Sequence, residues 1–325
     1  MTEFKSLLKD DIALFLRQKR AAGYPYEHNE MLLARFDALA KEQFPNEARI
    51  SREMVEAWLN LLPGEHPNGL LRRVTPIRQL AKFIAGNGKE AYILPGGIPR
   101  KQIKYTPYIY SEEELSSFFS TVDRHDYSYL DSIHQWTPRY VLPVIFRVYY
   151  CLGLRNSEAR MLHRSDVDLE TGEILVRESK GWRRRIVVAS EDLVELLAEY
   201  DSKMDSRMPG REMFFPCEDG KAFARGRLDL WFRRFLEESG IRKEGIPQRI
   251  HDLRHTHCVH LLNRWVKEGK NLEALYPYMS EHLGHRHFSD TDYYLTLSKE
   301  FYPELEKRMK DINDDILPEV CHAED

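Results

Sequence analysis

The sequence HDLRHT at residues 251–256 brings together two side-chain types that are well suited to binding a phosphate. His251 and Arg254 lie three residues apart, and a helix would place them on one face. The guanidinium offers a planar fork of hydrogen-bond donors, and the imidazole can donate or accept a proton near neutral pH. An isolated His and Arg at this spacing more often lie on a surface or cap a helix. Other segments of the chain have to decide between this structural interpretation and a phosphate site.

A second segment has the sequence LGH at residues 283–285 and is followed by two adjacent tyrosines. Gly284 is expected to end a helix, and Tyr294 follows His285 by nine residues. A tyrosine is usually a packing residue, because its ordinary pKa of about 10 keeps it protonated. Neighbouring cations and hydrogen bonds could turn it into a nucleophile. The spacing from His285 favours Tyr294, and Tyr293 is the alternative.

Two further segments are rich in cations. The sequence GLRNSE at residues 153–158 places Arg155 after an apolar stretch and a glycine. Arg155 could simply bind free carbonyls at a helix end, and Glu158 could hold its guanidinium in place. Residues 180–185 contain four cations in six positions, with Trp182 among them. Such a turn is often only solvated, but it also suits a nucleic-acid groove.

Taken in order along the chain, these four segments resemble the signature boxes of tyrosine recombinases of the phage-integrase family. GLRxSE resembles the first arginine box, and the basic turn resembles the strand-turn-strand unit that carries the catalytic lysine, here Lys180. HDLRHT resembles the His-x-x-Arg-His box, and LGH with Tyr294 resembles the final box. The resemblance covers residues 111–300, whereas residues 1–100 resemble only in style the helical core-binding domain of Xer-like and phage-integrase enzymes.

The resemblance implies a set of six catalytic residues: Arg155, Lys180, His251, Arg254, His285 and Tyr294. The two arginines would hold the non-bridging oxygens of the scissile phosphate and stabilise the transition state. Tyr294 would form a 3′-phosphotyrosyl bond while Lys180 protonates the leaving 5′-oxygen. His251 would assist proton transfer, His285 would hydrogen-bond the phosphate, and His255 is expected to have a structural role. No cofactor and no metal ion are expected, because cationic side chains would do the work of Mg²⁺.

Hydrophobic periodicity predicts a mainly α fold with a small β-sheet (α+β). Apolar stripes at helical spacing through residues 1–88 predict an N-terminal bundle of four helices, with Ser51 as an N-cap. The family resemblance implies that this bundle is a core-binding, SAM-like DNA-binding domain. Glycines and prolines interrupt residues 89–110, which predicts an interdomain linker.

Residues 111–300 are expected to form a mixed helical catalytic domain of the tyrosine recombinase type, which a capping box begins at Ser111. The expected secondary structure is an apolar helix at residues 140–152, strands at 174–177 and 185–188, and helices at 191–203, 227–239, 252–267 and 271–284. An apolar stripe continues through residues 301–325 and predicts a helical tail. This tail could pack on its own domain or, as the resemblance suggests, on a neighbouring protomer.

The charge of the chain is unevenly distributed. The net charge is −4, which alone does not indicate a DNA-binding protein. Residues 1–104 hold 17 Lys and Arg against 12 Asp and Glu, whereas residues 300–325 hold 3 against 9. Candidate DNA contacts, each of which taken alone is more often plain surface, are Arg72, Arg73, Arg78, Arg183, Arg184, Arg225 and Arg227, together with Lys221, Arg233 and Arg234.

Other classes of protein fit the composition poorly. The four cysteines are far apart, which argues against a cysteine zinc site and against a disulfide framework. The sequence contains no apolar run of about 18 residues, so no membrane span is expected. The charged N-terminus does not resemble a secretory signal. A cytoplasmic location with reduced thiols is therefore expected.

The resemblance implies a site-specific DNA recombinase or integrase that acts on double-stranded DNA. It further implies a homo-oligomer, a tetramer on two DNA sites, that integrates or excises a mobile element. Three alternatives stay open. A type IB topoisomerase shares the tyrosine chemistry but relaxes supercoils, a non-catalytic DNA-binding protein could use the same scaffold, and a generic helical protein would make all four segments accidental.

Overall fold

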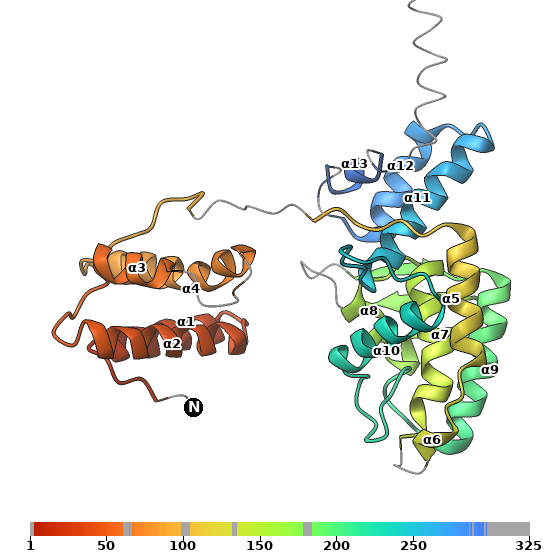
Figure 1. Ribbon diagram of the computed structural model, residues 1–325, viewed down its shortest axis with the longest axis horizontal. Helices are drawn as coiled ribbons and strands as arrows, with labels where there is room; N and C mark the ends of the chain where they lie inside the picture. Colours follow the sequence, from red (N-terminus) through yellow and green to blue (C-terminus); the bar gives the residue numbers. More distant parts are fainter. Residues whose placement is uncertain are drawn as a thin grey trace, which may run out of the picture. The chain divides into compact units, whose positions relative to one another are not determined.

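The computed structural model describes residues 3–60, 65, 67–98, 105–131, 135–177, 184–285, 287, 289–295 and 297. The chain divides into two compact units, Met1–Thr106 and Pro107–Asp325. Figure 1 colours the first unit red to orange and the second yellow to blue. Each unit has a hydrophobic core of its own.

The first unit is a small helical bundle. Its described helices are α1 (Lys9–Ala21), α2 (Glu27–Gln43), α3 (Arg52–Leu59) and α4 (Pro67–Gly86). The apolar stripes meet in a core that includes Phe15, Phe36 and Trp58. Ser51 caps α3 as predicted, because its hydroxyl accepts a hydrogen bond of 3.2 Å from the backbone N–H of Met54.

The expected linker at residues 89–110 is shorter than predicted. Leu94 is buried in the core of the first unit, and the backbone N–H of Tyr92 donates to the carbonyl of Ile50 at 2.8 Å. At the other end Tyr110 is buried in the second unit. The prediction relied on glycine and proline, which stop a helix but do not prevent an extended chain from packing its apolar side chains. Residues 99–104 lie outside the described residues.

The second unit is mainly helical and carries a two-stranded antiparallel sheet. Its described elements are α5 (Glu112–Arg124), α6 (Ser128–Asp131), α7 (Thr137–Cys151), α8 (Asn156–Arg160), η1 (Arg164–Asp166), β1 (Glu173–Val176), β2 (Arg185–Val188), α9 (Glu191–Arg207), α10 (Arg225–Glu238), α11 (His251–Lys267), α12 (Leu272–Leu283) and α13 (Ser289–Leu295). Helix α7 packs against α5, α9 and α11 (Figure 1). Aromatic rings fill the core, with Phe118, Phe146 and Phe232 in mutual contact.

The predicted mainly α fold with a small sheet is confirmed. The predicted capping box is present at Ser111, where the side chain of Glu114 also binds the backbone N–H of the capping residue. The turn between β1 and β2 at residues 178–183 and the tail at residues 301–325 lie outside the described residues. In the part of the chain that is described, no helix has the length and apolar character needed to cross a bilayer.

Candidate active site

Arg254 is the centre of the candidate site. It lies in the first turn of α11 and is only 1% exposed. Its guanidinium donates hydrogen bonds of 2.7 Å to the carbonyls of Gly153 and Leu283. Gly153 has a φ of +59°, and a Cβ there would lie 2.8 Å from the ring of His257. A glycine is therefore required where the segment of Arg155 meets α11.

Arg155 reaches the same place from the start of α8. One guanidinium nitrogen donates to the carbonyl of Gly284 at 2.8 Å, and another donates to Glu158 at 2.6 Å. Glu158 therefore has the holding role that the sequence suggested. Burial works against its ionisation, but hydrogen bonds and the charges of Arg185 and Arg155 lower the pKa of Glu158 to about 2. The carboxylate is charged at neutral pH.

Arg185 is the part of the site that sequence reasoning missed. It was grouped with the basic turn, yet its side chain is buried and its two terminal nitrogens bind the two oxygens of Glu158 at 3.0 and 2.8 Å. Its Nε donates to the carbonyl of His282 at 2.6 Å. The signal was available in the alternation of β2, because Arg185 shares its inward face with Val187.

His285 follows the end of α12, where Gly284 adopts a left-handed conformation and ends the helix as predicted. The Nε2 atom of His285 lies 3.1 Å from Arg254, and its Nδ1 lies 2.7 Å from the hydroxyl of Thr291. A guanidinium can only donate, so Nε2 accepts and Nδ1 carries the proton. Burial and the nearby arginines lower the pKa of His285 to about 4, which keeps this ring neutral.

Tyr294 lies on α13 and is 3% exposed. Its ring stacks on His285, with centroids 6.0 Å apart, and lies 5.5 Å from the ring of His255. Burial raises the pKa of Tyr294, and the neighbouring Cys258 raises it further, whereas the charge of Arg254 lowers it. Tyr293 is only half-buried.

His251 and His255 are in edge-to-face contact, with ring centroids 4.8 Å apart. Although His251 reaches solvent, the surrounding protein and then the nearby charges hold its pKa well below the ordinary histidine value. Burial and Arg254 lower the pKa of His255 to about 4. Both rings are neutral at physiological pH, so either can accept a proton.

The structure brings together five of the six candidate catalytic residues, namely Arg155, His251, Arg254, His285 and Tyr294. Lys180 lies outside the described residues. Among those described, no group of three or more His, Cys, Asp or Glu side chains is arranged to hold a metal ion.

Three of the proposed DNA contacts need correction, because their side chains are buried or half-buried and their guanidiniums bind other groups of the protein. Arg73 is buried and binds Glu65 and the carbonyl of Trp58. Arg78 donates to the carbonyls of residues 94, 95 and 98. Arg227 pairs with Glu218. Arg72, Arg184 and Arg233 are exposed, whereas Lys221, Arg225 and Arg234 are exposed and form surface ion pairs. Arg183 lies outside the described residues.

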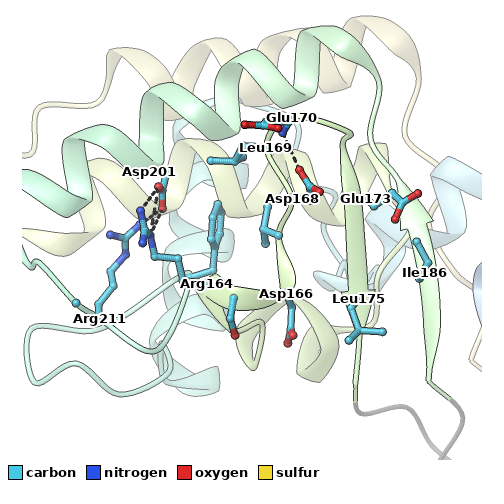
Figure 2. Close-up of a pocket in the computed structure, with 14 residues that line it drawn as sticks. Arg164, Asp166, Asp168, Leu169, Glu170, Glu173, Leu175, Ile186, Asp201 and Arg211 are labelled. Carbon is cyan, nitrogen blue, oxygen red and sulfur yellow. Dashed lines mark hydrogen bonds and ion pairs between the residues drawn. The ribbon is translucent and has the colours of Figure 1, made fainter.

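A hollow of about 770 Å³ lies elsewhere on the second unit and contains none of the candidate catalytic residues. The charged residues of its lining are mainly acidic, namely Asp166, Asp168, Glu170, Glu173 and Asp201 (Figure 2). Its two arginines, Arg164 and Arg211, both pair with Asp201. This hollow would repel a DNA backbone.

The sequence model of the phage integrase family matches residues 118–300. The chain belongs to this family, and its fold and clustered site make it a tyrosine recombinase. It is 26% identical over 319 residues to the integrase/recombinase named y4rB of Sinorhizobium fredii, with 94% of this chain and 98% of that protein covered.

One further relative and two solved structures are similar to this chain. The chain is 29% identical to the tyrosine recombinase XerC of Bacillus pumilus, with 72% of this chain and 74% of that protein covered. Among solved structures, the XerH site-specific recombinase bound to difH substrate superposes with a TM-score of 0.60 at 22% identity, covering 81% of this chain and 74% of the other. A lambda integrase tetramer bound to a Holliday junction gives a TM-score of 0.60 at 14% identity, over 86% and 77% of the two chains.

Proposed function

We propose that this tyrosine recombinase cleaves and rejoins double-stranded DNA at a specific site, through a 3′-phosphotyrosyl bond to Tyr294. One observation carries the proposal. Arg155, Arg254 and His285 come from three distant segments of the chain and converge on one place, and Tyr294 stacks on the last of them.

The charge of the cluster suits a phosphodiester. Among the described residues, the ion-paired group contains the guanidiniums of Arg155, Arg185 and Arg254 and one carboxylate, that of Glu158. The group therefore has a surplus of positive charge in a largely buried setting. A phosphate diester brings one negative charge, and the transition state of phosphoryl transfer develops more, so the surplus stabilises the transition state preferentially.

The proposed reaction needs only this chain and DNA. The phenol oxygen of Tyr294 bonds to phosphorus, and the bond from phosphorus to the 5′-oxygen breaks. The phenol proton passes to His251, directly or through its neighbour His255, and Lys180 gives a proton to the leaving 5′-oxygen. A 5′-hydroxyl of a second strand then attacks the phosphotyrosine and releases Tyr294. The number of phosphoester bonds is unchanged, so rejoining requires no ATP.

The phenol is stacked and buried before DNA binds. Burial raises its pKa, so the free protein holds a protonated, weakly reactive tyrosine. A phosphate bound between Arg155 and Arg254 would place its phosphorus atom beside the phenol of Tyr294. We propose that DNA binding brings the Tyr294 hydroxyl into line with phosphorus.

The assembly and the biological role follow from the same proposal. We propose that residues 1–88 form a core-binding domain, that residues 111–300 form the catalytic domain, and that the tail at residues 301–325 contacts a neighbouring protomer. Two exchanges at two DNA sites need four active sites, and one solved relative is a tetramer bound to a Holliday junction. We assign the enzyme to integration or excision of a mobile element in the cytoplasm, which agrees with the transposon integrase among the solved relatives.

The test is a covalent capture experiment without metal. Duplexes bound by the protein are first selected from a random-sequence pool, and nicks are then placed across the bound site so that the cleaved fragment diffuses away. The wild-type protein should form an adduct with DNA that survives denaturation. Tyr294→Phe should form none, while the matched variant Tyr293→Phe should retain it. An adduct that survives Tyr294→Phe, or the absence of any adduct on a bound site, would overturn the proposal.

A further inference from the structure

Arg185 has no part in the proposed reaction, yet it makes several hydrogen bonds within the candidate site. Its side chain is buried at the first position of β2, five residues after Lys180 in the sequence. The fork of its guanidinium spans both oxygens of Glu158, and its Nε binds the carbonyl of His282. One side chain therefore joins the sheet, α8 and the end of α12.

Glu158 and the same stretch of backbone at the end of α12 also hold Arg155. Glu158 binds the guanidinium and the backbone N–H of Arg155, at 2.6 and 2.9 Å. The remaining end of Arg155 donates to the carbonyl of Gly284, two residues after the carbonyl that Arg185 holds. Arg185 thus holds Glu158 directly and holds the backbone next to Gly284, and these are the two groups that bind the Arg155 guanidinium.

Gly284 shows how closely this arrangement is packed. A Cβ at this position would lie 2.9 Å from the Nη1 atom of Arg185 and 3.3 Å from the Nη1 atom of Arg155. The absence of a side chain lets the two guanidiniums share the backbone at the end of α12. This close approach is a second reason for a glycine here, beside its left-handed conformation.

We propose that Arg185 is a positioning residue for strand cleavage, which aligns Arg155 through Glu158 and through the chain at residues 282–284. This inference rests on the proposed function. It requires an arginine, because a lysine has the charge but cannot span two carboxylate oxygens and a carbonyl from one planar group. Arg185 does not itself need to touch the phosphate.

The test is a double-mutant cycle that measures the single-turnover rate of adduct formation. The substrate is the nicked duplex that was selected by binding to the wild-type protein. The variants are Arg185→Lys, Arg155→Lys and the double variant. A small displacement of a reacting group can cost about 100-fold in rate. Arg185→Lys should therefore slow cleavage by about 10- to 100-fold, while the dissociation constant for the duplex changes by less than about threefold. Adding Arg185→Lys to Arg155→Lys should slow cleavage by less than about threefold more.

Arg211→Lys is the matched control. The Arg211 side chain is also fully buried and pairs with a carboxylate, Asp201, but at the separate hollow of Figure 2. It should lower thermal stability without slowing cleavage. The inference fails if Arg185→Lys cleaves at the wild-type rate, if the two slowdowns multiply in the double variant, or if Arg211→Lys slows cleavage equally. If the wild-type protein still cleaves DNA in those cases, the proposed function stands and only the role of Arg185 is refuted. If the wild-type protein cannot cleave a site that it binds, the proposed function and the role of Arg185 are both refuted.

Discussion

Replacing Glu158 by glutamine removes one negative charge from between the guanidiniums of Arg155 and Arg185 and leaves the volume of the side chain almost unchanged. The Glu158 side chain is completely buried, so its hydrogen bonds are shielded from solvent. Its pKa of about 2 lies below the ordinary value of 4.5. Since one pKa unit corresponds to about 1.4 kcal/mol, the ionised form contributes about 3 kcal/mol to the free energy of unfolding at pH 7. This agrees with about 3–5 kcal/mol for breaking a buried ion pair.

The pH dependence has a definite sign. Because the folded-state pKa is depressed, the stabilisation is fully present above the unfolded-state value and is lost as the pH falls toward the folded-state value. The difference between the wild-type protein and Glu158→Gln should be about 3 kcal/mol at pH 7 and about half of that at pH 3. Four of the five tryptophans lie in the second unit, so urea unfolding followed by tryptophan fluorescence reports mainly on this unit.

An exposed carboxylate provides the control for this measurement. Glu244→Gln removes the same charge from an exposed position and should change the free energy of unfolding by less than about 0.5 kcal/mol. A Glu158→Gln variant that unfolds at the wild-type urea concentration at pH 7 would refute the reasoning. So would a difference that stays constant between pH 7 and pH 3.

Three further outcomes are expected. Cleavage should remain constant as the pH falls through 6.5 and decline only near pH 4, because burial and Arg254 hold the pKa values of His255 and His285 at about 4; a decline centred on pH 6.5 would contradict this. Arg73→Ala should lower the free energy of unfolding by about 3 kcal/mol without changing the salt dependence of DNA binding, since its ion pair is buried, and a reduced salt slope would restore it as a phosphate contact. Gly153→Ala should destabilise the second unit by at least about 1–2 kcal/mol, through its left-handed φ and the contact with His257, and wild-type stability in urea would contradict this.

Local patterns predicted the two strands and the long helices closely, but not the short helices α6, α8 and α13. Strand β2 begins and ends at the predicted residues, and β1 is displaced by one residue. Capping signals were equally reliable, as Ser51 and Ser111 show. These features depend on neighbours within a few residues, so the sequence contains most of the information that determines them.

The partners of buried arginines could not be predicted in the same way. Arg73 and Arg185 both looked like DNA-facing cations, because a local window shows only their charge. Their carboxylates lie eight and 27 residues away in the sequence, and their carbonyl partners depend on how helices meet. Only the inward register of β2 offered a clue for Arg185. Tertiary packing decides whether such a side chain faces solvent or holds another residue.

The hydrogen bonds of Arg254 to the carbonyls of Gly153 and Leu283 have an evolutionary consequence. Every residue type presents the same main-chain oxygen, so these contacts specify the path of the backbone and not the identity of the side chain. Position 283 can therefore accept other apolar residues as the family diverges, provided that the helix ends at the same place. Position 153 has no such freedom, because the ring of His257 occupies the space that a side chain would need. The arginine at the centre of the site thus tolerates drift in some neighbours while strictly constraining others.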